Sequence, residues 1–376
     1  MVYTRRDFGK ITLAGLPAAG LLLGSETTFG VALQRPNSKW AGVQVGMNVP
    51  YNFGVGNFMT GDAIIERCVQ LGVSGAELRA QPVELFLGSP AAIAGAANPG
   101  RGRGGAGGGA GRAGAPADPP AAAGTGAAVA GAPPPAGAAG ADAAGGQRGA
   151  RGGGRATLTP EQVAAQAAAA DETRKWRMGV SLDKVKEFRK KFEDAGVAIE
   201  IVKWDGIFAM SDDEVDYCFQ VSKALGANGL STEISLDDTK RVGLFADKHK
   251  MQIGYHGHAT TSVKDFETAF SYARYNAANL DLGHFVAGQN TSPVPFIKQY
   301  HDRITHVHVK DRKLNNGPNV PFGEGDTPIK EVLRLMRDNK WKFQATIEFE
   351  YPVPAGSDRM TEIAKALQYC KDCLLA

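Results

Sequence analysis

Histidines and carboxylates gather at the ends of several short apolar runs in the second half of the chain. Five of the 7 histidines lie at these places. The residues concerned are Glu233, His256, His258, Asp281, His284, His306, His308, Glu348 and Glu350. Imidazole and carboxylate groups together suit a divalent metal ion such as Mn²⁺, Zn²⁺, Co²⁺ or Mg²⁺. We therefore expect one such ion, provided that the fold brings these residues together.

A fold of alternating strands and helices would bring these residues together. Runs rich in β-branched residues alternate with stretches whose apolar residues recur at helical spacing, which predicts βα repeats and a parallel sheet. The predicted strands are 42–48, 73–79, 197–204, 228–233, 251–256, 279–284, 304–310 and 343–350. The predicted helices are 62–71, 182–195, 211–225, 236–250, 262–276, 293–301, 328–339 and 358–374. Eight units predict an α/β fold, a single (β/α)₈ TIM barrel over residues 40–376, with its active site at the carboxyl ends of the strands.

Two segments stand apart from this pattern. Residues 89–158 are nearly all Ala, Gly and Pro with scattered arginines and no aromatic residue. Such a segment cannot bury enough apolar surface to fold alone, so we expect a disordered insertion after the second strand. An arginine-glycine arm for nucleic acid is the alternative, which the lack of stacking aromatics disfavours. The following residues, 159–178, are rich in Ala and predict a helix that leads back into the barrel.

The N-terminus resembles a twin-arginine export signal. Arg5, Arg6, Phe8 and Lys10 precede an apolar stretch from Ile11 to Leu23. Residues 1–34 are therefore expected to be a signal peptide and the mature protein to be periplasmic or secreted. A short basic anchor is the alternative.

Composition narrows the classes of partner. The formal net charge of +3 disfavours nucleic acid. No apolar run reaches the roughly 20 residues of a membrane span, so no membrane insertion is expected after processing. The 4 cysteines do not form a disulfide framework. Cys68, Cys218 and the Cys370-x-x-Cys373 pair fall in helical patterns and are expected to be buried and reduced. A small sugar or glycoside is the expected partner, and a homo-oligomer is compatible with the sequence.

Five motifs together resemble the xylose isomerase-like barrel superfamily, in its sugar phosphate isomerase/epimerase branch. They are Tyr255-His256-Gly257-His258, Asp281-Leu282-Gly283-His284, His306-Val307-His308-Val309-Lys310-Asp311, Phe322-Gly323-Glu324-Gly325 and Ile347-Glu348-Phe349-Glu350-Tyr351. The resemblance runs from about residue 41 to 375, apart from the insertion, and implies the TIM barrel already expected from the repeats.

The resemblance implies roles for individual residues. One metal ion is typically held by Glu, Asp, His and Glu in this family, and the last three correspond to Asp281, His308 and Glu348. The first Glu is replaced here by His256 or His258, while Glu233 on the preceding strand could supply the carboxylate. The expected metal ligands are thus Glu233, His256, Asp281, His308 and Glu348. Residues expected to contact substrate are His258, His284, His306 and Glu324, with Lys310 beside the site.

The expected chemistry is removal of a proton next to a sugar carbonyl through an enediolate. Glu348 would be one base, Glu233 or a histidine a second, and Lys310 a further catalytic group. The leading hypothesis is a metal-dependent sugar isomerase/epimerase. A 3-keto-glycoside lyase or hydrolase is the alternative, since it needs only one strong base and suits an exported enzyme. A metal- and sugar-binding barrel without catalysis is a third hypothesis, and a trinuclear zinc nuclease a weaker one.

Polar residues at the early strand ends leave a further choice open. Glu77, Arg79, Lys203 and Asp205 point toward the predicted active face. They could bind substrate or pair with one another across the barrel mouth.

Overall fold

Eight parallel strands close into a barrel. The computed structural model describes residues 35–97 and 159–376. Within them the strands pair in the circular order β2-β11-β8-β7-β6-β5-β4-β3, and β3 pairs again with β2. The strands are β2 (Val43–Val49), β3 (Gly75–Arg79), β4 (Ala198–Lys203), β5 (Gly229–Glu233), β6 (Gln252–His256), β7 (Asn276–Asp281), β8 (Ile304–Val309) and β11 (Gln344–Ile347). The predicted TIM barrel is confirmed.

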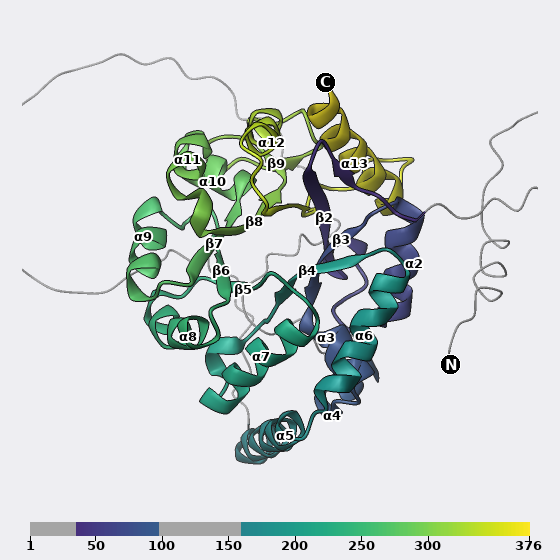
Figure 1. Cartoon of the computed structure of the whole chain (residues 1–376), viewed down its shortest axis with the longest axis vertical. Coiled ribbons are helices and arrows are strands. Elements are labelled where there is room, and N and C mark those ends of the chain that lie inside the picture. Colours follow the sequence, from purple (N-terminus) through teal and green to yellow (C-terminus); the bar gives the residue numbers. More distant parts are fainter. Residues whose placement is uncertain (1–34, 98–158) are drawn as a thin grey trace, which may run out of the picture. The chain divides into compact units, whose positions relative to one another are not determined.

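Helices surround the barrel (Figure 1). Most follow the predicted segments: α2 (Gly61–Leu71), α6 (Leu182–Asp194), α7 (Asp212–Ala224), α8 (Leu236–His249), α9 (Val263–Tyr272), α11 (Val294–Tyr300), α12 (Ile329–Asp338) and α13 (Arg359–Leu375). Their apolar faces join the strands in one core. The cysteines contribute to it, since Cys68, Cys218, Cys370 and Cys373 are buried and free, as predicted. Among the described helices, none is long and apolar enough to cross a membrane.

Strand β7, the sixth strand of the barrel, departs from its predicted limits. Residues 279–284 were expected to form it, but β7 begins at Asn276 and ends at Asp281. The Asp281 side chain accepts a hydrogen bond from the backbone N–H of His284 at 2.7 Å, which starts α10 (Leu282–Gln289) directly after the strand. Asn276 belongs to the strand and not to the preceding helix, because its buried amide bonds the Ala269 carbonyl oxygen at 2.7 Å. His284 therefore lies in the first turn of a helix.

The predicted insertion is shorter at its start than expected. Two helices follow β3, namely α3 (Ala80–Phe86) and α4 (Pro90–Ala97), so residues 90–97 are helical. The predicted helix after the insertion is confirmed as α5 (Pro160–Met178). Arg177 near its end forms ion pairs of 2.8 Å with Glu84 on α3 and Glu214 on α7. The predicted signal, 1–34, and residues 98–158 of the predicted insertion lie outside the described residues.

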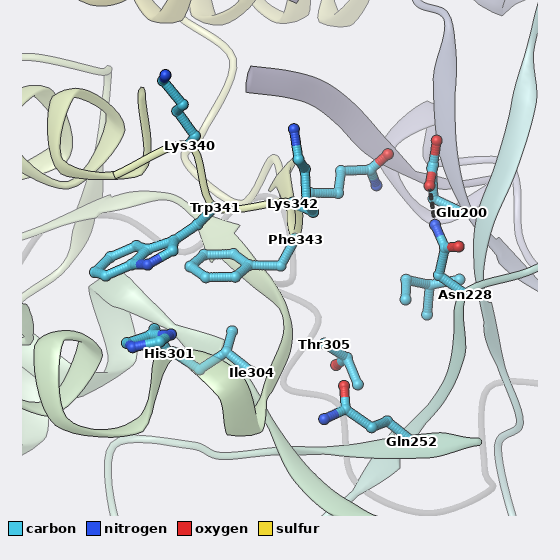
Figure 2. A pocket seen from close by; sticks show the side chains of 12 residues that line it. Glu200, Asn228, Gln252, His301, Ile304, Thr305, Lys340, Trp341, Lys342 and Phe343 are labelled. Carbon is cyan, nitrogen blue, oxygen red and sulfur yellow. Dashed lines mark hydrogen bonds between the residues drawn. The ribbon is translucent and has the colours of Figure 1, made fainter. Parts of the chain in front are cut away.

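A pocket of about 440 Å³ opens at the amino ends of the strands (Figure 2). Its lining includes Gln252, Ile304 and Gln344, the first residues of β6, β8 and β11. The Gln344 side chain packs inside this end of the barrel. Gly46 and Gly75 leave room for it, since a Cβ at either position would lie 2.3 to 2.4 Å from its amide. Because TIM-barrel chemistry occurs at the carboxyl ends of the strands, this pocket is at the opposite end from the expected site.

Candidate metal and active site

Four buried side chains converge at the carboxyl ends of neighbouring strands. His256 ends β6, Asp281 ends β7, His308 lies in β8, and Glu348 follows β11. One ligand atom from each lies within 4.8 Å of all the others. Strand register produces this arrangement, because Asp281 and Thr346 both pair with His308 and Glu348 is two residues beyond Thr346. We call these four residues the strand-end cluster.

The donor atoms of this cluster fit a cation. Each residue has one buried polar atom that makes no hydrogen bond: His256 Nδ1, Asp281 Oδ2, His308 Nδ1 and Glu348 Oε2. Ion-pair contacts join three of these atoms to charged groups, since Lys310 lies beside both carboxylate oxygens and His308 Nδ1 is 3.2 Å from Glu348 Oε2. Such atoms are costly to bury unless an ion or water satisfies them. The two carboxylates also match the charge of one divalent ion. The cluster could therefore hold such an ion.

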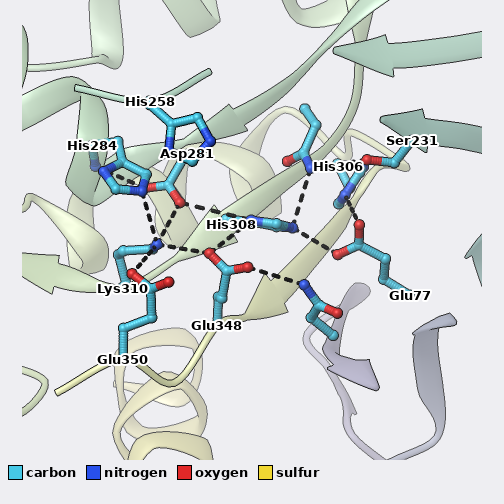
Figure 3. Close-up of polar contacts among 12 residues, drawn as sticks. Glu77, Ser231, His258, Asp281, His284, His306, His308, Lys310, Glu348 and Glu350 are labelled. Carbon is cyan, nitrogen blue, oxygen red and sulfur yellow. Dashed lines mark hydrogen bonds and ion pairs between the residues drawn. The ribbon is translucent and has the colours of Figure 1, made fainter. Parts of the chain in front are cut away.

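Lys310 is the cationic neighbour of the cluster. Its buried Nζ lies 2.9 Å from Asp281 Oδ2, 2.7 Å from Glu348 Oε2 and 2.7 Å from Glu350 Oε2 (Figure 3). Burial lowers the pKa of Lys310, but Asp281, Glu348 and Glu350 outweigh it and raise the pKa well above its usual value. Lys310 is thus a fixed positive charge beside the strand-end cluster.

Glu77 contacts the Nε2 atoms of two histidines, His306 and His308. Its carboxylate, fully buried on β3, lies 2.6 Å from His308 Nε2 and 3.2 Å from His306 Nε2. Burial raises the pKa of Glu77, but His308 and His306 lower it well below the usual range. A carboxylate on Nε2 leaves Nδ1 of His308 as the atom that faces the cluster. His306, expected to contact substrate, is fully buried and is also bound at Nδ1 by Thr305 at 2.9 Å.

Glu233 lies outside the strand-end cluster. Its carboxylate is 2.8 Å from Lys203 Nζ and 2.7 Å from His258 Nε2. Burial raises the pKa of Glu233, but Lys203 and His258 lower it to about 2. The side chain of His258 is 42% exposed, so this pair stands at the barrel mouth. The structure thus places Glu233 with His258, although the sequence prediction grouped it with the metal ligands.

The other residues considered at the mouth are paired. Arg79 lies 2.5 Å from Asp205. His284 Nδ1 is 2.8 Å from Arg312 Nη1, and its Nε2 is 3.3 Å from Lys310 Nζ. His256, His258 and His284 also have ligand atoms close together.

Glu324 lies on an exposed loop after β8. Asp311 fixes this loop by accepting hydrogen bonds from the backbone N–H groups of Gly323, Gly325 and Thr327 at 2.8 to 3.2 Å. Glu324 is therefore carried by an ordered segment, and the structure does not place its side chain in the strand-end cluster.

The second half of the barrel matches a known protein family over residues 233–373. That family is the xylose isomerase-like TIM barrel. The match contains all four residues of the strand-end cluster.

Curated proteins and a solved structure are also similar to this chain. The inosose dehydratases of Clostridium botulinum (strain Eklund 17B / Type B) and Clostridium tetani (strain Massachusetts / E88) are 28% and 24% identical over 155 residues. Each alignment covers 35% of this chain and 51% of the relative, so the chain spans about half the length of the curated relatives it matches. The probable 3-DHS dehydratase involved in petrobactin synthesis from Bacillus anthracis superposes with a TM-score of 0.50 at 11% identity, covering 87% of this chain and 99% of that one. This last likeness shows the fold alone.

Sequence reasoning missed two hydrogen bonds that support the site. Asn48, near the end of β2, donates a hydrogen bond of 3.0 Å to Glu348 Oε1. Tyr51 donates one of 2.7 Å to Glu350 Oε1. Asn48 lies in the first strand of the barrel and Tyr51 just after it, a region that holds no histidine or acid. A search of every strand end for amide and hydroxyl groups would have found them.

Proposed function

We propose that this protein is a metal-assisted lyase that eliminates a substituent from a polyhydroxylated ketone of the sugar or cyclitol class. The observation that carries the proposal is that a proton acceptor and a separate proton donor flank a cation-binding cluster. Glu348 is the acceptor within the cluster, and His258, supported by Glu233, is the donor at the mouth. The dehydratase names of the curated relatives support elimination.

The residues would divide the reaction between them. A divalent cation held by His256, Asp281, His308 and Glu348 would polarise the substrate carbonyl. Glu348 removes the proton from the carbon next to that carbonyl, and Asn48 on Oε1 holds the carboxylate in place. Lys310 stabilises the negative charge that develops on the carbonyl oxygen. The C–O bond then breaks on the next carbon, β to the carbonyl. The Nδ1 proton of His258 passes to the departing oxygen, which leaves as water or an alcohol.

Isomerisation or epimerisation is the second candidate, since it begins with the same proton removal. The His258–Glu233 pair also favours it, because an epimerase needs a second group to return the proton from another side. Elimination is preferred because the Glu233 carboxylate on Nε2 raises the pKa of His258 and so favours the imidazolium, whose Nδ1 proton can be donated.

We also propose that the enzyme acts after export, on free sugars or glycosides. The support is the twin-arginine pattern at Arg5 and Arg6. Fractionation of cells producing the wild type and the Arg5→Lys/Arg6→Lys variant tests this. Export of the wild type with retention of the variant supports the proposal, and equal distribution contradicts it.

Product analysis in D₂O tests the reaction. The metal-loaded protein is incubated with an inosose, a free ketose and a 3-keto-glucoside, and the products are followed by NMR. Loss of water or release of the aglycone supports the lyase. Deuterium next to the carbonyl with a new sugar and no fragment moves the assignment to the isomerase/epimerase. Glu348→Gln must abolish either reaction, and no exchange with any substrate despite bound metal would leave a binding protein.

A further inference from the structure

We infer that the strand-end cluster selects a zinc-class ion, Zn²⁺ or Co²⁺, over Mg²⁺, and that His256 sets this preference. The inference rests on the cation site of the proposed function and goes beyond it in naming the class of metal. His256 adds a second imidazole to the cluster, so the selectivity follows from this chain's own ligand atoms.

The donor set is the first argument. Two imidazoles and two carboxylates converge, and the Nδ1 atoms of both imidazoles lie among the ligand atoms without making a hydrogen bond. Imidazole nitrogen suits Zn²⁺ and Co²⁺, whereas Mg²⁺ requires oxygen ligands in near-octahedral geometry. A second imidazole in place of a carboxylate therefore penalises the harder ion most.

Glu233, which the sequence predicted as a ligand, does not add a carboxylate oxygen to the cluster. Glu233 is paired in register with His256 on the adjacent strand and is the nearest substitute by position. Its two oxygens are already bound to Lys203 and His258. Recruiting Glu233 would leave the buried Lys203 ammonium without its partner, which costs free energy.

Lys310 increases the difference between the two classes of ion. It lies 2.9 and 2.7 Å from the two carboxylates of the cluster, Asp281 and Glu348. A hard ion depends on the negative charge of its oxygen ligands, and Lys310 neutralises part of that charge. The imidazole nitrogens are not affected in this way, and Glu77 strengthens His308 as a ligand through its other nitrogen.

Metal binding by the full chain tests the inference without any substrate. The metal-free protein is dialysed against Zn²⁺, Co²⁺, Mn²⁺ and Mg²⁺ separately and in competition, and bound metal is measured by mass spectrometry. We expect one Zn²⁺ or Co²⁺ per chain, bound tighter than Mg²⁺ by tenfold or more, about 1.4 kcal/mol. The visible absorption of bound Co²⁺ should report nitrogen ligands and should change in His256→Glu.

Variants at His256 make the test specific. His256→Glu should bind Mg²⁺ and Mn²⁺ more tightly and reduce the ratio of Zn²⁺ affinity to Mg²⁺ affinity by about tenfold. His256→Gln should bind Zn²⁺ more weakly without binding Mg²⁺ more tightly. His301→Gln, an exposed residue at the other end of the barrel, is the matched control and should retain wild-type ratios. Circular dichroism verifies that each variant is folded.

The outcomes separate this inference from the proposed function. Equal affinity for Mg²⁺ and Zn²⁺, or an unchanged ratio in a folded His256→Glu protein, overturns the selectivity and leaves the lyase proposal standing. Failure to bind any of the four ions overturns both. Selective binding of Zn²⁺ or Co²⁺ by a protein without lyase activity supports the inference and contradicts only the proposed reaction.

Discussion

Glu77 Oε2 and His308 Nε2 lie 2.6 Å apart, although 231 positions separate the two residues in the chain. Both side chains are fully buried. The contact joins the second strand of the barrel to the seventh and directs the other nitrogen of His308 into the strand-end cluster. A carboxylate in this position fixes the tautomer of a metal-binding imidazole and raises its basicity.

Replacing Glu77 by Gln should therefore weaken metal binding. The amide can accept one hydrogen bond but lacks the charge, so we expect metal affinity to fall by roughly 10- to 100-fold. Equilibrium dialysis of the metal-free protein measures the change, with Glu331→Gln on the exposed face of α12 as control. A folded Glu77→Gln protein with unchanged affinity would restrict Glu77 to a structural role.

Loss of the Glu348 carboxylate should remove catalysis while leaving the barrel intact. Glu348→Gln preserves the size of the side chain and an oxygen for Asn48, but it cannot take a proton. We expect kcat to fall by on the order of 10²- to 10⁴-fold, the usual contribution of a general base. Steady-state kinetics at saturating metal separates this effect from weaker metal binding. Retention of more than a tenth of wild-type kcat would assign proton removal to another group.

The repeating part of this architecture could be predicted from sequence, because local patterns determine it. Strand-helix periodicity located all eight barrel strands, and strand ends rich in His and acid located the strand-end cluster. Asn276 was predicted in a helix but lies in β7, and His284 was predicted in a strand but lies in α10. A buried amide placed the first at the start of a strand, and a capping aspartate placed the second in a helix.

Local sequence patterns could not predict which side chains contact one another. Glu233 could bind metal or pair elsewhere, and only its distance from Lys203 and His258 distinguishes these alternatives. Glu77 and Asn48 support ligands more than 200 residues away in the chain. Spacing along a sequence carries no information about contacts of this kind, since closure of the barrel creates them.

The helix that returns from the insertion should depend on Arg177. Its guanidinium is 12% exposed and bridges Glu84 and Glu214 at 2.8 Å. Arg177→Met leaves two largely buried carboxylates without their cation, so we expect the free energy of unfolding to fall by about 3–5 kcal/mol. Urea denaturation followed by circular dichroism measures it.

Arg174→Met is the matched control for this prediction. Arg174 lies one turn earlier on the same helix, and its pair with Asp213 is exposed on both sides. Because exposed pairs contribute about 0–1 kcal/mol, the control should be nearly neutral. Equal effects of the two substitutions would show that the Arg177 bridge does not anchor α5.

Glu233 should make stability depend on acid pH. Its pKa falls from 4.5 to about 2 in the folded protein, since Lys203 and His258 outweigh the effect of burial. A carboxyl group with a lowered pKa stabilises the fold above its unfolded pKa. This stabilisation is lost as the pH falls from about 4.5 to about 2. At pH 7, Glu233→Gln should lower the free energy of unfolding by about 1–3 kcal/mol, less than a fully buried pair because the Glu233 side chain is 32% exposed.

The difference between wild type and Glu233→Gln should shrink through that acid window, because protonation of the wild-type carboxyl group removes the same charge as the substitution. Urea denaturation of both metal-free proteins at pH 7, 4.5, 3.5 and 2.5 measures it. Asp265→Asn, whose carboxylate caps α9 away from the strand-end cluster, controls for the general effect of removing an acid. A difference between wild type and Glu233→Gln that stays constant from pH 7 to pH 2.5 would mean that Lys203 and His258 do not hold Glu233 in its charged form.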